Sequence, residues 1–288
     1  MPFPDNGVQA TLDIEKSAPR IPANVLAVVA DKSAIGEQFV DLQPRDDTAP
    51  YLTKNSAITE KNTRIPVDTK TLLVDMDPQG NASSGVGVRP GTTPLTIYEA
   101  LIGNATLTEV LQKTPQETLF LAPATQDLTA VEYELFDENR GTHLRTVLER
   151  DARDFEFVII DSPPSLGVLT LNVLVAAERV IVPLQPEYYA LEGITYLMAT
   201  IDRVKNSLNP GLTVEGIVLT MWDPRNRLAH QVADEVRKHF RVFDSIIPRN
   251  VRLSEAPSHG LPALLYDVGS KGAQGYLSLA HELIGAPA

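Results

Sequence analysis

The segment Thr71-Leu-Leu-Val-Asp75-Met-Asp77-Pro-Gln-Gly80 decides the fold of this chain. Its first residues form a short apolar run, which is typical of a buried strand. Two carboxylates, on Asp75 and Asp77, stand at the carboxyl end of that run, beside residues that favour a turn. Parallel α/β sheets bind their ligands at the carboxyl ends of their strands. The segment therefore predicts both a parallel sheet and the edge that carries its site.

Beyond residue 70 the chain alternates between apolar runs of strand length and segments with helical periodicity. In residues 191–208 apolar side chains recur every three or four positions, which predicts a helix. Strands that are apolar throughout and separated by helices imply a mainly parallel sheet with helices on both faces, so the predicted fold class is α/β. The predicted strands are Leu72–Val74, Leu119–Ala122, Phe157–Ile160, Val180–Val182 and Ile217–Thr220.

The first 70 residues carry a weaker pattern, and we divide the chain into a divergent segment, 1–70, and a main domain, 71–288. Residues 1–20 have the composition of a loose tail. Residues 24–30, Asn-Val-Leu-Ala-Val-Val-Ala, are a candidate first strand of the main sheet. Residues 31–70 hold one glycine and three prolines without a sustained period, which indicates a long irregular connection.

Composition limits the class of protein. The chain has 288 residues, 43% of them apolar, no cysteine and a net charge of −12. This is enough for a buried core, and it excludes disulfides and thiolate metal sites. With no apolar run near the ~20 residues that span a membrane, and no basic start before an apolar stretch, we expect a soluble cytoplasmic protein without membrane contact. The charge argues against nucleic-acid binding by the whole surface, although residues 221–271 carry eight basic side chains against six acidic ones.

Three aspartates are candidates for phosphate chemistry. Asp75 and Asp77 can orient a water molecule or hold Mg²⁺ beside a phosphate. Asp161 ends an apolar run and precedes Ser162-Pro-Pro, and an aspartate at the end of a buried parallel strand is how nucleotide hydrolases hold Mg²⁺. Each also has a purely structural interpretation, because Asp-Pro-Gln-Gly is ordinary turn chemistry and Asp161 suits a turn or a helix N-cap. The residues alone leave both interpretations open.

Two later segments carry further polar candidates. Residues 185–193 lead from a strand end into the predicted helix, and their two adjacent tyrosines favour packing or interface contacts. In the second segment, Arg249 and Arg252 can meet phosphate, and the amide of Asn250 can read the edge of a base. Taken singly, each arginine is more often a solvated surface residue. His259, alone in its loop, gives no reason to assign a ligand role.

Together these segments resemble the ParA/Soj chromosome- and plasmid-partitioning ATPases, which are relatives of MinD. The resemblance extends over residues 71–285, and its four runs occur in the order of that family. They are Leu72-Leu-Val-Asp-Met-Asp-Pro-Gln-Gly-Asn-Ala-Ser-Ser-Gly, Ile159-Ile-Asp-Ser-Pro-Pro-Ser-Leu-Gly, Gln185-Pro-Glu-Tyr-Tyr-Ala-Leu-Glu-Gly and Ile247-Pro-Arg-Asn-Val-Arg-Leu-Ser-Glu-Ala-Pro-Ser-His-Gly.

The resemblance implies a P-loop NTPase-like fold of the deviant Walker A type, using ATP and Mg²⁺. It implies a homodimer that sandwiches nucleotide, binds non-specific DNA on the nucleoid when loaded with ATP, and lets go after a centromere-binding ParB-type protein stimulates hydrolysis. By the same resemblance Asp77 is catalytic and positions the attacking water, while Asp161 holds the metal through water. The resemblance also assigns nucleotide binding near the adenine to Pro248 and Asn250 and DNA contacts to Arg225 and Arg252.

One element of that family pattern is missing from the sequence. A Lys-Gly-Gly-Val-Gly-Lys-Thr-type phosphate loop should follow the first strand, because its backbone N–H groups cradle phosphates and its lysines neutralise them. After Ala30 the chain instead reads Asp31-Lys-Ser-Ala-Ile-Gly36-Glu, with a single glycine between acidic residues. Residues 31–70 are a true replacement of the loop, a damaged or misassembled coding sequence, or an unconventional phosphate site. We rank the first two above the third.

Two classes of function follow from this departure. The first is a ParA-type partitioning protein whose own ATP hydrolysis is in doubt, because the main electrostatic clamp on the transferred phosphoryl group is lost. The second is a non-enzymatic pseudo-ATPase that binds DNA or an intact ParA partner. A third interpretation, an unrelated metabolic α/β enzyme, requires a substrate pocket that these motifs do not indicate. Dependence of DNA binding on nucleotide separates the first two.

Overall fold

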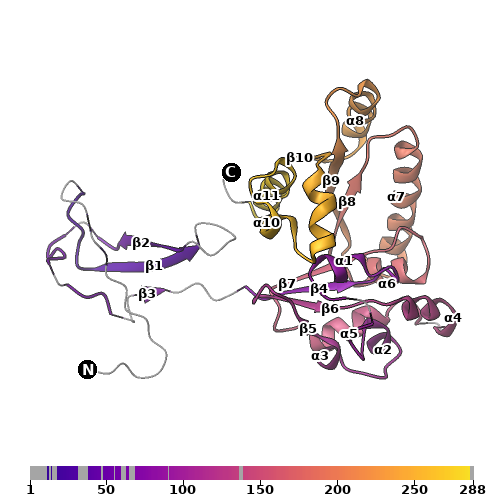
Figure 1. Cartoon of the computed structure of the whole chain (residues 1–288), viewed down its shortest axis with the longest axis horizontal. Helices are drawn as coiled ribbons and strands as arrows, with labels where there is room; N and C mark the ends of the chain where they lie inside the picture. The colour runs from indigo at the N-terminus through magenta and orange to yellow at the C-terminus, as the bar shows by residue number, and fades with distance from the viewer. Residues whose placement is uncertain are drawn as a thin grey trace. The chain divides into compact units, whose positions relative to one another are not determined.

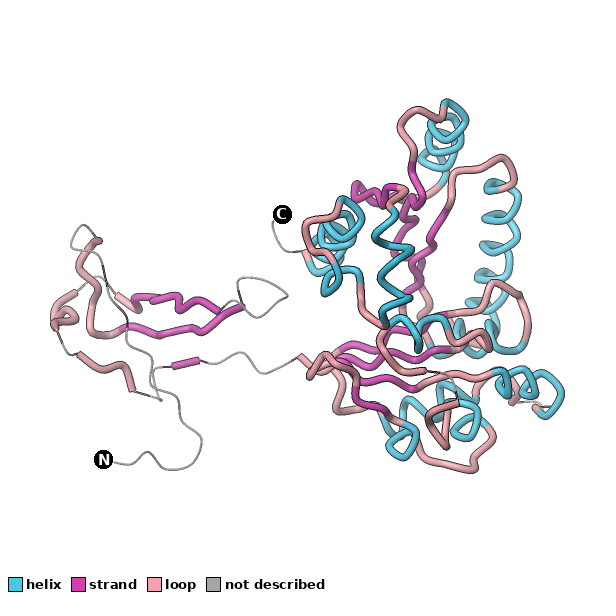
Figure 2. Tube along the Cα trace, viewed as in Figure 1, coloured by secondary structure: helices cyan, strands magenta, loops and turns pink. Residues whose placement is uncertain are grey.

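The computed structural model describes residues 12, 14, 18–31, 38–46, 48–54, 56–59, 63–64, 69–89, 91–135 and 139–285 (Figures 1 and 2). These residues belong to two compact units, one up to Val67 and one from Asp68 onward. The division lies within a few residues of the one placed between residues 70 and 71 from the sequence. No helix in the described ranges is both long and apolar enough to cross a membrane.

The N-terminal unit contains a small three-stranded sheet. Strand β1 (Val25–Asp31) pairs antiparallel with β2 (Gln38–Pro44) from Val25 opposite Pro44 to Asp31 opposite Gln38, and parallel with β3 (Thr63–Arg64). The candidate strand at 24–30 therefore exists, but its partners are β2 and β3, not the strands of the main sheet. The prediction of an irregular connection over residues 31–70 was wrong at β2. Residues 38–44 form a strand there because they pair antiparallel with β1 in a local hairpin. Residues 32–37, the expected place of the phosphate loop, lie outside the described residues.

The C-terminal unit begins with a sheet in the order β5-β6-β4-β7. Strand β4 (Thr71–Asp75) is central and runs parallel to both β6 (Leu119–Ala122) and β7 (Phe157–Asp161). Only the short β5 (Gln112–Lys113) in this sheet is antiparallel to its neighbour. The register sets Asp75 directly opposite Asp161, so the carboxyl ends of β4 and β7 coincide.

Short helices with well-defined starts pack around this sheet. Two of them begin with a capping box, in which a threonine and a glutamate satisfy the free N–H groups of the first turn. The Glu99 carboxylate accepts a hydrogen bond from the Thr96 N–H at 2.7 Å, and Glu109 accepts one from Thr106 at 2.8 Å. The helices of this part are α1 (Asn81–Gly85), α2 (Ile97–Leu101), α3 (Leu107–Val110), the 3₁₀ helix η2 (Gln126–Ala130), α4 (Val131–Glu134), α5 (His143–Asp151) and α6 (Val168–Ala176).

A second sheet, in the order β10-β9-β8, is entirely parallel. Alternate residues of its central strand contact different helices, as expected when side chains point to opposite faces. Ile217 and Leu219 pack in one cluster with residues of α7 and α8, while Val218 packs with Leu279 of α11. This sheet therefore carries helices on both faces. The elements are β8 (Arg179–Leu184), α7 (Ala190–Ser207), β9 (Thr213–Trp222), α8 (Arg227–His239), β10 (Val242–Pro248), α9 (Val251–Glu255), η3 (Ala256–His259), α10 (Ala263–Tyr266) and α11 (Lys271–Ile284).

The predicted α/β class with a mainly parallel sheet and helices is thus confirmed, and all five predicted strands are present. Within this fold Phe157, Val158 and Ile159 of β7 are exposed, although the run is apolar throughout. The physical reason is that β7 ends its sheet: it pairs with β4 on one edge, and no described strand pairs with the other.

Two elements connect the parts that carry the two sheets. Helix α6 follows β7, and the amide nitrogen of Asn209 donates to the carbonyls of Leu174 and Ala177 at its end, at 3.0 and 2.7 Å. On the other side α1 meets η3, where a methyl group built on Gly260 would lie 3.1 Å from the Cα of Gly87. Both glycines have positive φ angles, +65° for Gly260 and +91° for Gly87.

We predict that Gly260→Ala destabilises the protein by about 2 kcal/mol, because alanine disfavours this backbone conformation and its methyl group meets backbone rather than a movable side chain. Chemical denaturation measures the effect. Gly103→Ala is the matched control, since Gly103 has a φ of +80° with nothing within 4 Å of the added methyl group. Equal losses for the two variants would contradict a role for the contact between α1 and η3.

Candidate functional site

Asp75 is a structural carboxylate at the end of β4. Its side chain is fully buried, and one oxygen accepts hydrogen bonds from both the N–H and the hydroxyl of Ser83 at 2.8 and 2.7 Å. The other oxygen accepts from the N–H of Asp77 at 3.1 Å. Ser83 Oγ in turn accepts from the N–H of Ala124 at 3.2 Å. Asp75 therefore fixes the turn after β4 and the start of α1, and the structural interpretation of this residue fits its contacts.

Asp77 lies in the turn itself and is partly exposed. Its carboxylate accepts from the N–H of Gln79 at 3.0 Å, and its carbonyl accepts from the N–H of Gly80 at 2.9 Å. Gly80 has a φ of +64°, a left-handed conformation that glycine adopts without strain and that lets the chain turn into α1. One carboxylate hydrogen bond leaves most of the acceptor capacity of Asp77 available to solvent or a ligand.

Asp161 ends β7 beside these two acids. The N–H of Met76 donates to its carbonyl at 2.9 Å, which holds the two strand ends together. Burial, followed by the negative charges of Asp75 and Asp77, raises the pKa of Asp161 from 3.8 to about 6. No lysine or arginine among the described residues contributes an opposing effect on this pKa. In the part of the chain that the structure describes, the site therefore places three carboxylates at one sheet edge, with no cation offsetting the charge of Asp161.

The donor set fits part of a magnesium site. Mg²⁺ prefers oxygen ligands and is usually held by one or two carboxylates together with phosphate oxygens and water. Asp161 and Asp77 provide carboxylates of that kind at the expected sheet edge. Within the described ranges, however, no three acidic or histidine side chains converge to form a complete metal cage. These residues therefore suit a metal ion that arrives with a ligand supplying further oxygens.

A second polar region lies at the carboxyl ends of β8, β9 and β10. It contains a cavity of about 150 Å³, below the ~300–1,000 Å³ of most small-molecule sites, so it suits one portion of a ligand. Met221 lines it with a φ of +51°, an uncommon conformation for a residue other than glycine and one that clusters at functional sites. The lining residues are Gln185, Pro186, Glu187, Met221, Asp223, Asn226, Ala229 and Arg249.

The two expected nucleotide-binding residues flank this cavity without lining it. Pro248 ends β10 opposite Trp222, and Asn250 is the N-cap of α9, where its side-chain oxygen accepts from the N–H of Arg252 at 2.9 Å. The residue between them, Arg249, does line the cavity, and its N–H donates to the carbonyl of Trp222 at 3.1 Å.

The two expected DNA-binding arginines are already paired with acids. The Arg225 side chain, 88% exposed, binds Asp223 with contacts of 2.9 and 3.0 Å. Arg252 contacts Glu255 at 2.8 Å and Asp267 at 3.3 Å. A phosphate must compete with these carboxylates, which reduces what either arginine contributes to binding.

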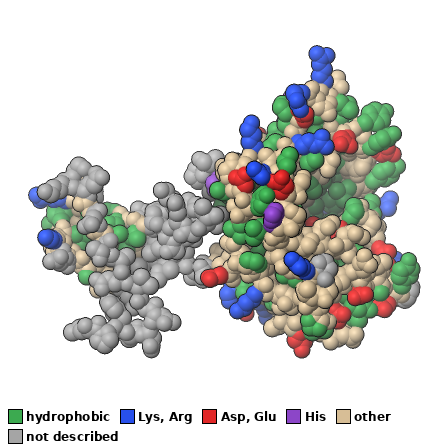
Figure 3. All heavy atoms as spheres, viewed as in Figure 1, with side chains coloured by type: hydrophobic (Ala, Val, Ile, Leu, Met, Phe, Trp, Pro, Cys, Tyr) green, Lys and Arg blue, Asp and Glu red, His purple; other side chains and the backbone are tan. Residues whose placement is uncertain are grey.

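Other basic groups of residues 221–271 are more available. In the part of the chain that the structure describes, Arg227, Arg249 and Lys271 have no carboxylate within ion-pair distance. Figure 3 shows lysine and arginine side chains gathered over α8 and the neighbouring loops. Among the described residues, Arg227, Arg249 and Lys271 are therefore the basic side chains of this stretch that no ion pair neutralises.

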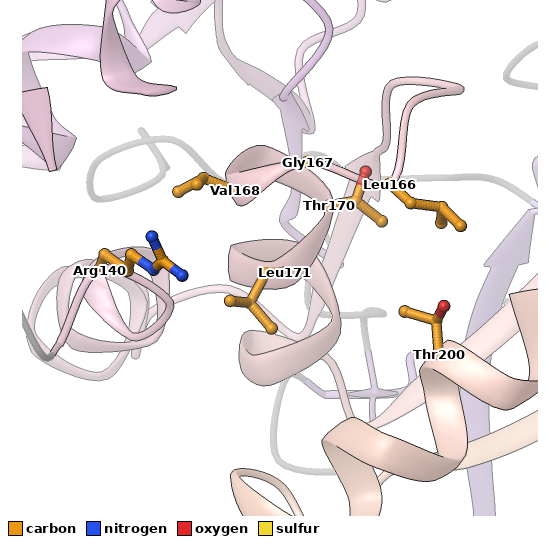
Figure 4. Close-up of a pocket in the computed structure, with 7 residues that line it drawn as sticks. All are labelled: Arg140, Leu166, Gly167, Val168, Thr170, Leu171 and Thr200. Carbon is orange, nitrogen blue, oxygen red and sulfur yellow. The ribbon is translucent and has the colours of Figure 1, made fainter. Parts of the chain in front are cut away.

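A larger cavity lies away from all the expected site residues. It has a volume of about 300 Å³ and is mostly apolar, with Arg140 at one side and Thr200 of α7 at the other (Figure 4). Its lining is Arg140, Leu166, Gly167, Val168, Thr170, Leu171 and Thr200. Neither the three aspartates nor the residues at 248–252 contribute to it, so it offers no support for the expected chemistry.

Mainly parallel strands that alternate with helices place the chain in the α/β class, to which P-loop ATPases of the ParA and MinD type also belong. Solved structures agree with this fold. The cobyrinic acid a,c-diamide synthase of Mycobacterium smegmatis, with bound ADP and magnesium, superimposes with a TM-score of 0.65 at 36% identity, over 75% of this chain and 81% of that one. The cell division ATPase MinD of Pyrococcus furiosus superimposes with a TM-score of 0.63 over 75% and 86%, at 24% identity.

Sequence relatives identify the family. A family model described as an AAA domain matches residues 64–214. The chain is 54% identical to the chromosome partitioning protein ParA of Myxococcus xanthus over 75% of its length and 78% of the relative. It is 45% identical to the chromosome partitioning protein ParA of Caulobacter vibrioides over 91% and 94%. The chain belongs to the ParA/Soj family of chromosome-partitioning ATPases, as the four sequence runs indicated.

We predict that Asp161→Asn stabilises the protein above pH 6. The raised pKa means that the folded protein binds this proton more tightly than the unfolded chain, so the charged form carries a cost. That cost is absent below about pH 4, grows between about pH 4 and pH 6, and is complete above about pH 6. Since the carboxyl is only partly buried, we expect a gain on the order of 1 kcal/mol.

Chemical denaturation across this pH range measures the gain. Asp154→Asn, which removes an exposed carboxylate from the turn before β7, is the control and should leave stability nearly unchanged at every pH. A gain for Asp161→Asn that does not diminish toward pH 4 would count against the raised pKa.

Proposed function

We propose that this chain is a ParA-type partitioning protein that acts in chromosome or plasmid segregation as an ATP-controlled, DNA-binding dimer. The observation that carries the proposal is the placement of Asp77 and Asp161 at one sheet edge in a chain 54% identical to a chromosome partitioning protein. A match over 91% of the chain to a second such protein includes part of the first 70 residues, so the similarity is not limited to the C-terminal unit.

In this proposal Mg·ATP binds along the carboxyl ends of the strands. Asp161 holds the metal, Asp77 orients the attacking water, and Pro248 and Asn250 lie near the base. The cavity lined by Met221 and Arg249 is adjacent to these last two residues and suits a group of about the size of a base. Bound Mg²⁺ supplies positive charge to the phosphates and to the carboxylate cluster, which also favours the charged form of Asp161.

We propose that ATP hydrolysis by this chain is weak, because the sequence after Ala30 departs from the family's phosphate-loop pattern. Among the described residues no lysine or arginine offsets the raised pKa of Asp161, and the sequence has no glycine- and lysine-rich loop after Ala30. The cradle and its lysines stabilise the charge of the transferred phosphoryl group, and losing such a clamp typically costs orders of magnitude in rate. We therefore propose that turnover by this chain alone is far below that of an intact family member.

The second candidate is a non-enzymatic homologue that binds DNA or an intact ParA partner. The same lack of a cationic neighbour to Asp161 favours it, since a carboxylate cluster without a cation repels the phosphates of ATP. Under either function we propose a cytoplasmic, nucleoid-associated protein that contacts non-specific DNA through Arg225 and Arg252. A centromere-binding ParB-type protein is the proposed regulator.

We expect calorimetry to separate the two candidates. If the chain is an ATP-controlled switch, Mg·ATP binds in the micromolar range, and Asp161→Ala weakens binding because the carboxylate that holds the metal through water is lost. Asp154→Ala, which removes an exposed acid outside the site, is the control and should bind as tightly as the unaltered chain. Absence of binding at millimolar ATP would leave the non-enzymatic homologue.

DNA binding is tested by two variants with opposite expected effects. Arg252→Ala should weaken binding to a non-specific duplex several-fold and reduce the magnitude of its salt dependence by about one phosphate contact. Glu255→Gln should strengthen it, because it removes a competing carboxylate 2.8 Å from Arg252. Titrations at several salt concentrations, with and without ATP, measure both. Unchanged affinity in both variants would remove Arg252 from the proposed DNA surface.

A further inference from the structure

The larger cavity, of about 300 Å³, combines an apolar wall with one positive group. Leu166, Val168 and Leu171 supply apolar side chains, and the guanidinium of Arg140 is directed toward α6 at one side (Figure 4). Leu166 is 54% exposed, so a ligand that covers it removes apolar surface from water. The volume lies at the lower end of the range of small-molecule sites, and the cavity therefore suits a compact ligand.

Arg140 is the lining group that can pair with a charged ligand. Across the described ranges, no carboxylate lies within ion-pair distance of its side chain. The two lining hydroxyl groups are already used, because Thr170 donates to the carbonyl of Ser165 and Thr200 donates to the carbonyl of Tyr196. An anion at this cavity thus meets a cation that it need not take from another acid.

The backbone at Arg140 is held against α6 by contacts that leave the guanidinium free. The carbonyl of Arg140 accepts a hydrogen bond from the side-chain amide of Asn172 at 2.7 Å, and Asn172 is fully buried. The next residue, Gly141, packs so closely that an added methyl group would lie 2.8 Å from Cδ2 of Leu171. The cation is therefore anchored beside the apolar wall, which lowers the ordering cost of binding a ligand there.

A nearby acid limits the charge that this cavity accepts. The Glu132 carboxylate stands beside Gly167, where its Oε1 would lie 2.2 Å from a methyl group built on the glycine. It repels a doubly charged phosphate more strongly than a singly charged carboxylate. A carboxylate also matches the planar guanidinium of Arg140, which can donate two parallel hydrogen bonds to it.

We propose that the larger cavity binds a small carboxylate with an unbranched apolar chain, such as a medium-chain fatty acid. The carboxylate pairs with Arg140, and the chain lies against Leu166, Val168 and Leu171. Burial of the chain provides affinity, and the ion pair sets its direction. This site goes beyond the proposed function, because it takes a ligand of a different class and requires neither ATP nor DNA.

Calorimetric titration of the full chain with octanoate, without nucleotide, tests the proposal. We expect saturable binding. Butanoate should bind at least roughly tenfold more weakly, because it has four fewer methylene groups to bury. Octylamine should not bind, because its ammonium group meets the guanidinium of Arg140. Octyl phosphate should bind more weakly than octanoate, because its second charge is repelled by Glu132.

A pair of arginine variants tests the ion pair. Arg140→Gln should weaken octanoate binding at least roughly tenfold, the effect of losing one charge-assisted pair. Arg153→Gln is the matched control and should leave binding unchanged, since this exposed arginine donates to the carbonyl of Glu149 at 3.0 Å and does not line the cavity.

A pair of threonine variants tests the location. Thr200→Phe fills part of the cavity and should prevent binding. Thr195→Phe is its control on the same helix, because the hydroxyl of Thr195 likewise donates to the carbonyl four residues earlier but the residue does not line the cavity. Thermal melts without ligand verify that all four variants fold. Octanoate should also slow hydrogen exchange of the amides in the first turn of α6.

Four results would overturn the proposal. They are no saturable binding of octanoate to the unaltered chain, binding unaffected by Arg140→Gln, equal affinity for butanoate and octanoate, and binding of octyl phosphate as tight as that of octanoate. Because nucleotide and DNA are absent from these titrations, their failure leaves the proposed ATP and DNA functions untouched. Failure of those functions likewise leaves this site standing.

Discussion

The parallel pairing of β4 with β7 is the constraint on which the candidate site depends. It sets Asp75 opposite Asp161, and the hydrogen bond from Met76 to the Asp161 carbonyl extends the pairing past the last residue of the strand. The two acids then differ in role because their surroundings differ. Asp75 receives three hydrogen bonds from neighbouring groups, while Asp161 is partly buried beside two negative charges. One register thus creates both a structural anchor and a carboxylate that needs a cation.

The C-terminal unit contains two sheets with largely separate cores. The carboxylates and the smaller cavity lie at the strand ends of these sheets. The core around β4 is built with α2, α3 and α5, and the core around β9 with α7 and α8. Their connection depends on α6, on Asn209 and on the close approach of Gly87 to Gly260. The three carboxylates belong to the first sheet, whereas the cavity beside Arg249 belongs to the second. A buried cluster of Leu174 and Val175 of α6 with Ile201 and Val204 of α7 also joins the two parts, and a ligand that uses both must span this junction.

The sequence was sufficient for the class of fold, for all five predicted strands and for the family, because apolar runs and strand-end motifs are local signals. The sequence was insufficient wherever the role of a residue or the pairing of a strand depends on a partner elsewhere in the chain. Ser83 matters to the structure because its N–H donates to the carboxylate of Asp75, eight residues earlier. Arg252 forms an ion pair with Asp267, which lies in a loop fifteen residues later. Strand β1 looked like a member of the main sheet because its composition is right, but a hairpin partner was available closer in the chain. The exposure of β7 accompanies an edge on which no described strand pairs, and the residues of β7 alone do not predict this.

The acids at the two ends of β7 disfavour pairing of this strand with the same strand of a second copy. Glu156 precedes the strand and Asp161 ends it, so the apolar residues stand between two carboxylates. When two copies of this edge pair antiparallel in full register, each Glu156 lies opposite an Asp161. When they pair in parallel, Glu156 lies opposite Glu156 and Asp161 opposite Asp161. Both arrangements bring negative charges together on molecules that already carry a net charge of −12. These residues therefore act as gatekeepers, which keep an exposed apolar strand from seeding aggregation.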